Sequence, residues 1–311
     1  MPRRASRRSG SRMGPLVSLI VLIFFAAVAG WWLLRPKPHP VIHYVFHTLA
    51  PSAEPPAPAA TPVAPPAATR LPSAVPAASP TSTPAANAQG PKLALIVDDC
   101  GQWITTERGF VALEIPLTLS VLPDVPYTSV IATEASHAGK GVMLHLPMET
   151  LSGLNPGPGK VTTEMSDTQI VAQVQSDLAE VPLARGVNNH EGSKASADPR
   201  VMRAVIGVLA EHNLFFIDSK TNAASVGEDT ARQMGVPTAA RDVFLDNRAD
   251  VAYSEAQLSQ AAAIAQRTGS AIAIGHPRPT TLEAVRAMIP RLQALGIQFV
   301  LVQDLVGKNG A

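Results

Sequence analysis

The sequence lacks the features that define several common classes of protein. Cys100 is the single cysteine among 311 residues, so no intrachain disulfide can form, and nothing near it in sequence would activate a thiolate. We therefore expect Cys100 to be a small packing residue. Five arginines crowd the first twelve positions and the rest of the chain is near neutral, which argues against a nucleic-acid partner. Neither GxGxxG nor GxxxxGK[ST] occurs, so no motif indicates a nucleotide.

One long apolar segment stands out near the amino terminus. Residues 15–34 read PLVSLIVLIFFAAVAGWWLL and carry no charge, and about 20 such residues suffice to cross a membrane as a helix. Arginines precede the segment, and Trp31 and Trp32 lie where an interfacial aromatic belt would be. These signals predict a cytoplasmic basic segment at 1–14 and a single transmembrane anchor at 15–34. The chain is thus expected in the inner (cytoplasmic) membrane, with its main domain in the periplasm.

A cleaved signal peptide is the competing interpretation of this segment. The triplet Ala27-Val28-Ala29 resembles a small-residue cleavage site. The length of the apolar run, which continues through two tryptophans, favours retention as an anchor. Both interpretations place the rest of the chain outside the cytoplasm.

Residues 35–91 are rich in proline and alanine. Proline donates no backbone hydrogen bond and restricts the residue before it, so neither a helix nor a sheet can run through this segment. The composition predicts a disordered, semi-extended linker between the anchor and a domain at 92–308.

From Lys92 onward, short apolar runs alternate with amphipathic stretches. The expected strands are 93–97, 117–121, 142–146, 186–189, 214–218, 243–246, 271–275 and 298–302, and the expected helices are 127–138, 166–180, 198–213, 254–268 and 280–295. Strand alternating with helix predicts an α/β domain with a parallel sheet. The number of units favours a distorted (β/α)7-type barrel, and an open doubly wound sheet is the alternative.

Polar residues follow most of the expected strands. They are Asp98, Asp99, His145, Glu149, Asn188, Asn189, His190, Asp218, Asp246 and His276. Each has an ordinary explanation, because an aspartate can cap the next helix and a lone histidine is usually a hydrogen-bonded structural residue. In a parallel barrel, however, the carboxyl ends of the strands meet at one face. Three histidines and several aspartates at these ends therefore predict a shared site.

The same segments carry a resemblance to a known family. They are IVDDCG at 96–101, LTLSVLP at 117–123, VMLHLPME at 142–149, GVNNHEGS at 186–193, FFIDSKT at 215–221, RDVFLDN at 241–247 and IAIGHPRPTTLE at 272–283. Together they resemble the divergent polysaccharide deacetylases, remote relatives of NodB-type carbohydrate esterases. The resemblance implies a NodB-like barrel, a divalent metal such as Zn²⁺, and hydrolysis of acylated sugars.

The resemblance also implies roles for individual residues. NodB-type enzymes carry an Asp-Asp pair whose first member is a base and whose second is a metal ligand, and a late histidine is the acid. Asp98, Asp99 and His276 match that layout. Within the domain at 92–308 no two histidines have the HxxxH spacing of those enzymes, so His145 and His190 would have to replace that motif. One carboxylate and two imidazoles are a sufficient ligand set for catalytic zinc, which keeps a position open for water.

Five other residues are expected around this core. Asp246, Asp218 or Glu149 would orient an imidazole, and Asn188 and Asn189 would hydrogen-bond a sugar hydroxyl. The predicted function is metal-dependent removal of acyl groups from an envelope carbohydrate. The missing HxxxH motif keeps open a non-catalytic envelope module that binds glycan or a protein. A metal-dependent phosphodiesterase fits the ligand types but lacks an evident Arg/Lys clamp beyond Arg241 and Arg278.

Overall fold

The structure, a computed structural model, describes residues 90–307. The predicted basic segment, the predicted anchor and the predicted linker up to residue 89 lie outside this range. None of the helices within 90–307 combines the length and the apolar character needed to span a bilayer.

The described residues build a nine-stranded sheet in which every strand pair is parallel. The strands are β1 Lys92–Cys100, β2 Thr118–Val121, β3 Gly141–Met148, β4 Gly186–Glu191, β5 Phe215–Asp218, β6 Thr238–Ala240, β7 Val243–Phe244, β8 Ser270–Gly275 and β9 Gln298–Val300. Their order is β6-β5-β4-β3-β2-β1-β8-β7, and β9 also pairs with β1. In a doubly wound sheet the order of successive strands reverses near the middle of the sheet. Here successive strands are added in one direction, as they are around a barrel.

The barrel stays open between β6 and β7, so the fold is a parallel α/β half-barrel. Only Arg241 and Asp242 separate these two strands. Neighbouring parallel strands need a crossover of a dozen or more residues, so a two-residue link cannot bring β6 and β7 into a parallel pair. The α/β class and the parallel sheet are confirmed, and this open half-barrel is consistent with the distorted, NodB-like barrel that the sequence predicts.

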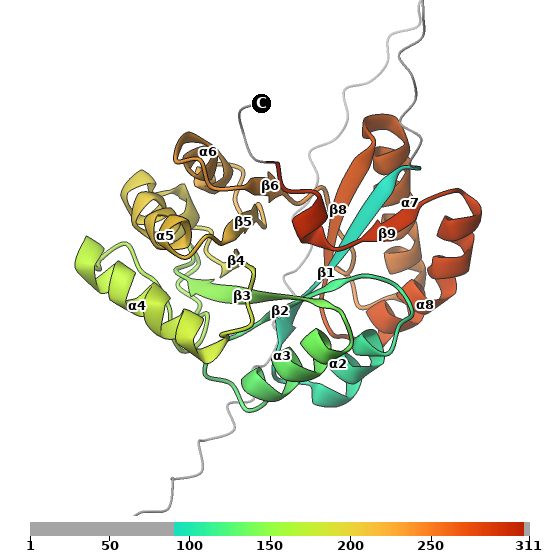
Figure 1. Cartoon of the computed structure of the whole chain (residues 1–311), viewed down its shortest axis with the longest axis horizontal. Coiled ribbons are helices and arrows are strands. Elements are labelled where there is room, and N and C mark those ends of the chain that lie inside the picture. Colours follow the sequence, from blue (N-terminus) through green and yellow to red (C-terminus); the bar gives the residue numbers. More distant parts are fainter. Residues whose placement is uncertain (1–89, 308–311) are drawn as a thin grey trace, which may run out of the picture. The chain divides into compact units, whose positions relative to one another are not determined.

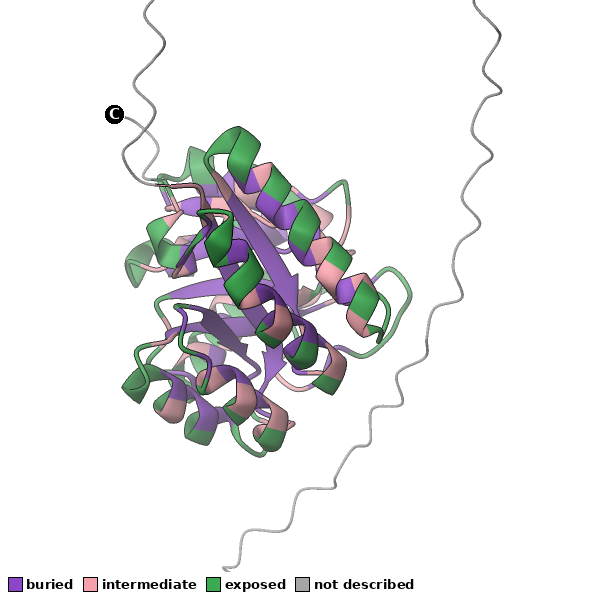
Figure 2. Cartoon of the chain, turned by 90° about the vertical axis from the view of Figure 1, so that its right-hand side faces the viewer, coloured by how far each residue is buried: buried purple, intermediate pink, exposed green. Residues whose placement is uncertain are grey.

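Helices cover the convex face of the sheet (Figure 1). They are α2 Ile104–Val111, α3 Thr128–His137, α4 Asp167–Glu180, α5 Pro199–Glu211, α6 Gly227–Gln233, α7 Val251–Thr268 and α8 Pro279–Ala294, with 3-10 turns η1 Ala195–Ala197 and η2 Val302–Asp304. Local sequence sets several of their starts. Ser166 and Gln169 form a capping box before α4, and Asp198 caps α5 with Pro199 at its first position. Figure 2 shows the resulting amphipathicity, with buried inner and exposed outer helix faces.

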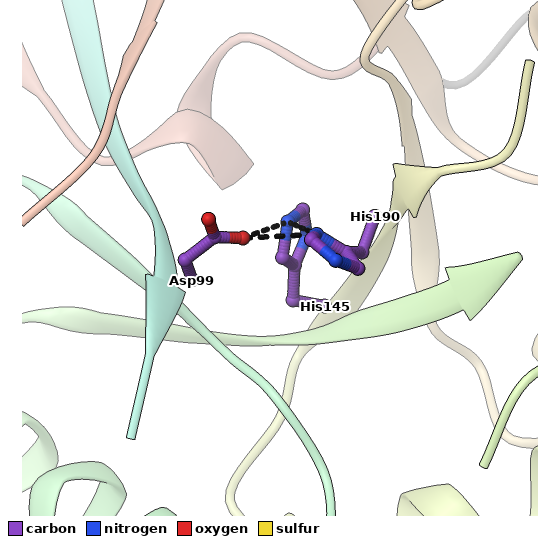
Figure 3. Close-up of side chains that lie close together, drawn as sticks. All are labelled: Asp99, His145 and His190. Carbon is purple, nitrogen blue, oxygen red and sulfur yellow. Dashed lines mark hydrogen bonds and ion pairs between the residues drawn. The ribbon is translucent and has the colours of Figure 1, made fainter. Parts of the chain in front are cut away.

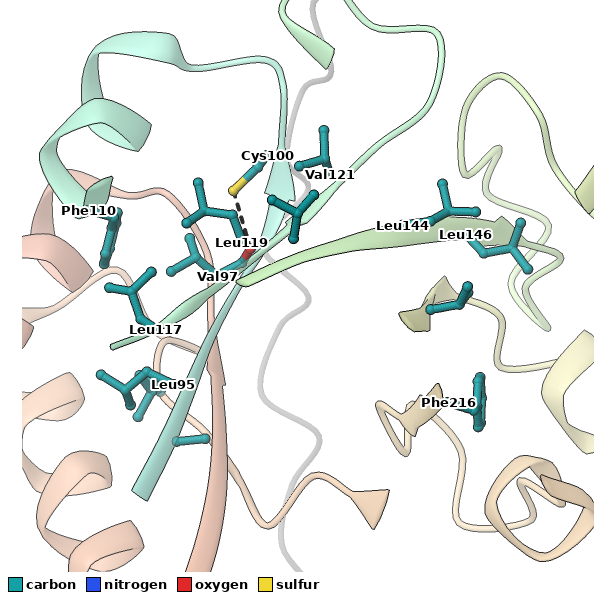
Figure 4. Close-up of a cluster of buried hydrophobic side chains, with 14 of the residues drawn as sticks. Leu95, Val97, Cys100, Phe110, Leu117, Leu119, Val121, Leu144, Leu146 and Phe216 are labelled. Carbon is teal, nitrogen blue, oxygen red and sulfur yellow. Dashed lines mark hydrogen bonds between the residues drawn. The ribbon is translucent and has the colours of Figure 1, made fainter. Parts of the chain in front are cut away.

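Alternation along the strands divides the core into two clusters. Residues such as Leu95, Val97 and Leu144 point outward and pack under the helices (Figure 4). Their neighbours point inward and fill the concave side, where Val302 of η2 joins them. This inner cluster comprises Ala94, Ile96, Met143, Phe215, Ile217, Ile272, Ile274 and Val302. Successive side chains of a strand face opposite sides of the sheet, so the two-residue alternation accounts for both the outer and the inner cluster.

Cys100 belongs to the outer cluster. It is fully buried, and its Sγ lies 3.2 Å from the carbonyl oxygen of Val97 (Figure 4). Burial raises the pKa of this thiol well above its usual range, so the thiolate is disfavoured. The side chain packs beneath the helices, as the sequence predicts.

Asp177 on α4 makes stability depend on pH. Its side chain is 3% exposed, Oδ1 accepts a 2.9 Å hydrogen bond from Gln173, and Oδ2 has no partner. Burial, with smaller contributions from Glu180 and Asp124, raises its pKa from 3.8 to about 7. The folded state therefore holds a proton that the unfolded state releases, and stability falls as pH rises from about 4 to 7.

We expect Asp177→Asn to stabilise the protein at pH 8 and to change little at pH 4. At most, the free energy of unfolding at pH 8 should rise by about 1.4 kcal/mol per unit of pKa shift. Urea unfolding at the two pH values measures it. An equal effect of the substitution at both would contradict the buried-carboxylate account.

Candidate metal centre

The inward positions of the strands turn polar just beyond the apolar layer. Five polar residues each come two positions after an inward apolar or glycine residue, either within a strand or just after its end. They are Asp98 of β1, His145 of β3, Asn188 of β4, Ser219 after β5 and His276 after β8. The register pairs His145 directly with Asn188 on the neighbouring strand. The convergence expected from the strand ends is therefore a consequence of the two-residue period.

Asp99 does not follow this alternation. As the neighbour of inward-facing Asp98 it would point outward, but its φ of 57° is left-handed, and the register of β1 with β2 shifts between Val97 and Cys100. Aspartate tolerates this conformation better than most residues. The turn that follows is held by Glu107, whose Oε1 accepts the N–H groups of residues 101, 102 and 103 at 2.7–3.0 Å. Two consecutive carboxylates thereby face the same site.

The left-handed conformation of Asp99 gives a prediction on stability. Asp99→Gly and Asp99→Ala both remove the carboxylate and differ only in Cβ, which is strained at positive φ. We expect the glycine variant to be more stable by about 1 kcal/mol. In a regular strand the order would be the reverse, so an alanine variant more stable in urea unfolding would contradict the turn.

Three side chains bring one atom each to a common point (Figure 3). Asp99 Oδ1 lies 2.9 Å from His190 Nδ1 and 3.2 Å from His145 Nε2, and the two nitrogens are 3.1 Å apart. Asp99 Oδ1 is buried and makes no contact with hydrogen-bond geometry. Three electron-rich atoms at these separations repel unless a proton or a cation lies among them.

Asn188 determines which nitrogen of His145 faces that point. Its Nδ2 donates to Asp98 Oδ1 at 2.9 Å, and an ionised carboxylate can only accept, so the amide oxygen must face the other way. That oxygen lies 2.8 Å from His145 Nδ1, which therefore carries the hydrogen. The lone pair of Nε2 therefore points to the position that Asp99 Oδ1 and His190 Nδ1 also face. Second partners of this kind orient metal-binding imidazoles.

The donor set fits a divalent metal. Two imidazole nitrogens and one carboxylate oxygen are ligands of catalytic zinc, and around tetrahedral zinc such atoms lie about 3.3 Å apart. The separations of 2.9–3.2 Å are close to this value. Among the described residues, Asp99, His145 and His190 are the one group of three that meets the spacing needed to hold an ion.

The pKa of each aspartate at the centre reflects its burial and its neighbouring histidines. Burial raises the pKa of Asp98, and His145, His276 and the Asn188 amide oppose this without cancelling it. For Asp99, burial acts in the same direction, but His190 and His145 outweigh it and hold the pKa well below its usual range. The first carboxylate is thus the better proton acceptor and the second the better anionic ligand.

His276 and Asp246 form a pair beside the three atoms. His276 Nδ1 lies 2.8 Å from Asp246 Oδ1, and Asp246 Oδ2 accepts from the backbone N–H of His276 and from Thr281. The other ring nitrogen lies 3.9 Å from Asp99 Oδ2. Burial lowers the pKa of His276, but the Asp246 hydrogen bond and the charge of Asp99 outweigh it and raise the pKa to about 9. His276 is therefore an imidazolium near neutral pH.

Residues 95–306 match the family model described as divergent polysaccharide deacetylase. The chain belongs to this family. It is 35% identical over 201 residues to an uncharacterized protein of Haemophilus influenzae, an alignment that covers 65% of this chain and 72% of that one. It is 36% identical over 201 residues to the uncharacterized protein YibQ of Escherichia coli, covering 65% of this chain and 63% of that one, less than two thirds of its length.

A solved structure shares the fold. The crystal structure of an uncharacterized protein from Agrobacterium tumefaciens superposes with a TM-score of 0.67 at 23% identity, covering 72% of this chain and 92% of that one. The half-barrel is thus the fold of this deacetylase family member and of that protein.

Two carboxylates expected near an imidazole lie elsewhere in this family member. Asp218 points outward from β5, where it accepts from Ser225 at 2.8 Å and from the backbone N–H of Glu228 at 3.1 Å. Glu149 accepts from Thr163 and pairs with Lys194 at 2.7 Å. Neither contacts a histidine of residues 90–307, and of the three carboxylates only Asp246 orients an imidazole there. Asp218 and Glu149 instead fasten the loops around the site.

The two asparagines also differ from the predicted contact with a sugar. Asn188 is fully buried between Asp98 and His145, out of reach of a substrate. Asn189 points outward, where it accepts from the backbone N–H of Ser219 and lies 3.3 Å from Thr221. Asn188 therefore orients the site from within, and Asn189 holds the adjoining loop.

Sequence reasoning missed two residues that contact this network. The hydroxyl of Ser120 donates to the amide oxygen of Asn188, and the hydroxyl of Thr281 donates to Asp246. Ser120 lies two residues after inward Thr118, so strand alternation contains the signal for it. Thr281 is in the first turn of α8, and no pattern in the sequence singles it out.

Proposed function

We propose that this protein is a metal-dependent hydrolase that removes acyl groups, acetyl in particular, from a carbohydrate of the cell envelope. The observation that carries the proposal is the convergence of Asp99, His145 and His190 between Asp98 and His276. Family membership supports the substrate class. The apolar segment at 15–34 supports a domain that is tethered to the membrane and works in the periplasm.

Asp99, His145 and His190 would hold the metal. A divalent ion such as Zn²⁺ bound there supplies a Lewis acid that lowers the pKa of a water molecule and polarises an acyl carbonyl. Asn188 keeps the Nε2 lone pair of His145 directed at the ion's position, and the low pKa of Asp99 keeps its carboxylate anionic.

Asp98 is the proposed general base. Its Oδ2 lies 3.6 Å from His145 Nε2, so it adjoins the ligand atoms without being one of them. Burial raises its pKa, which makes it a stronger base than an exposed carboxylate. It would take one proton from water as the oxygen adds to the acyl carbon.

His276 is the proposed general acid. Asp246 fixes the ring through Nδ1, so Nε2 carries the proton toward the centre. The hydrogen bond between Nδ1 and Asp246 favours the protonated ring, so Nε2 can donate this proton at neutral pH. As the bond from acyl carbon to sugar nitrogen or oxygen breaks, His276 would protonate the departing atom. The products are a carboxylic acid and a free amine or hydroxyl on the sugar.

Acetate release tests the proposal. Full-length protein is incubated with an N-acetylated glucosamine oligomer and with an O-acetylated glycan, untreated, after chelation, and after Zn²⁺ is restored. We expect release that chelation abolishes and zinc restores. Glycan binding without release under all three conditions would favour the non-catalytic module, and cleavage of a phosphodiester without acetate release would favour the phosphodiesterase.

A further inference from the structure

Arg241 lies in the two-residue link between β6 and β7, at the open edge of the half-barrel. Its Nε donates to the carbonyl oxygen of Ser219 at 2.8 Å, and its Nη2 to that of Lys220 at 3.1 Å. Both carbonyls follow the end of β5, where the polar layer begins. The backbone of one strand end thus fixes the direction of this guanidinium.

An aromatic ring connects Arg241 to the proposed acid. The guanidinium carbon lies 3.8 Å from the centre of the Phe244 ring. That ring is nearly parallel to the His276 imidazole, with an angle of 19° and centres 6.4 Å apart. Arg241, Phe244 and His276 therefore form a row that leads from the open edge to the metal centre.

The charge of Arg241 is not neutralised by an ion pair among residues 90–307. Two of its five N–H groups donate to carbonyls, and no carboxylate of residues 90–307 lies within 4.0 Å of its guanidinium nitrogens. By contrast, Lys194 pairs with Glu149 and Lys220 pairs with Asp218. Burial lowers the pKa of Arg241, and the charges of Asp218, Asp242 and Asp98 oppose this without cancelling it. A guanidinium that is held rigidly and partly desolvated, with no carboxylate at ion-pair distance among these residues, is suited to binding an anion.

We propose that Arg241 and Phe244 form a subsite for a sugar that bears a carboxylate, next to the sugar that loses its acyl group. This inference rests on the proposed function and specifies its substrate class. The sugar ring would lie against the edge of Phe244, because Arg241 covers a face of that ring, and the sugar carboxylate would accept from the free N–H groups of Arg241. One guanidinium balances one negative charge. The nearby carboxylates of Asp218, Asp242 and Asp98 disfavour a dianion, so the assigned ligand is a carboxylate rather than a phosphate monoester.

A binding experiment tests the subsite without relying on catalysis. Calorimetry compares an oligogalacturonate with the same oligomer after its carboxylates are reduced to alcohols. We expect the full-length protein to bind the acidic form at least about tenfold more tightly, which is about 1.4 kcal/mol. Arg241→Gln should abolish the preference, and Arg241→Lys, which keeps the charge without the planar fork, should keep part of it. Arg203→Gln, on the exposed side of α5, is the matched control.

A kinetic experiment separates this inference from the proposed function. With acetylated forms of the two oligomers, Arg241→Gln should raise KM for the acidic substrate about tenfold, change kcat little and leave the neutral substrate unaffected. Equal binding of both oligomers by the unmodified protein, or a preference that survives Arg241→Gln, overturns the subsite. Acetate release from both substrates at equal efficiency overturns the subsite alone. Preferential binding of the acidic oligomer without any release supports the subsite and contradicts the hydrolase.

Discussion

Asp98→Asn is expected to lower the rate of acyl release by about 10²–10⁴-fold, the usual contribution of a general base. The substitution keeps the shape of the side chain, and an amide oxygen can still accept from Asn188 Nδ2, as the carboxylate does at 2.9 Å. The orientation of Asn188, and through it the tautomer of His145, should therefore persist. What is lost is the capacity to take a proton from water.

The measurement combines steady-state acetate release with metal content and urea unfolding of the same preparations. Asp229→Asn, an exposed aspartate on α6, is the matched control and should leave all three unchanged. A rate within about threefold of the unmodified protein would contradict the role of Asp98 as base. If metal content fell together with the rate, Asp98 would belong to the ligand set instead.

His145→Ala and His190→Ala are each expected to weaken zinc binding by more than 100-fold. Loss of a residue that only supports a ligand typically lowers metal affinity 10–100-fold, and removal of a ligand itself should exceed that. His145 is 2% exposed, so its truncation also leaves a cavity and should lower stability more than truncation of His190, whose side chain is 18% exposed. The two variants should thus share a defect in metal affinity and differ in stability.

Competition with a chromophoric chelator measures the affinity. His212→Ala is the control, because this exposed histidine caps the end of α5 and lies outside the ligand set. Unchanged zinc affinity in either ligand variant would remove that histidine from the site. Unchanged zinc affinity in both variants would contradict a metal site formed by Asp99, His145 and His190.

Much of the fold follows from the period of the sequence. The apolar runs predict every strand except β6, whose three residues, Thr238–Ala240, are too few to show alternation. The helices that escape prediction, α2 and α6, have eight and seven residues, and α6 is mostly polar. The opening of the barrel could not be predicted without β6, because the two-residue link between β6 and β7 can be recognised only when both strands are identified. A short strand missed in the sequence thus hides the main departure from the expected barrel.

The site divides in the same way. Asp98, His145 and His276 point inward because each continues the in-and-out alternation of a buried strand, and this alternation can be read from the sequence. The same alternation accounts for Asp218. It lies two residues after Phe216, whose side chain points outward, and so it also points away from the metal centre. Asp99 cannot be placed by this rule, since its inward direction depends on one left-handed residue. Long-range partners such as Thr281 for Asp246 arise only from tertiary packing.

The most direct test of the metal centre is anomalous diffraction at the zinc absorption edge from crystals of the zinc-loaded protein. The account predicts one strong peak bound by Asp99 Oδ1, His145 Nε2 and His190 Nδ1, with Asp98 and His276 beside it but not coordinated. A zinc peak held by other residues, or no peak among these three at saturating zinc, would contradict it.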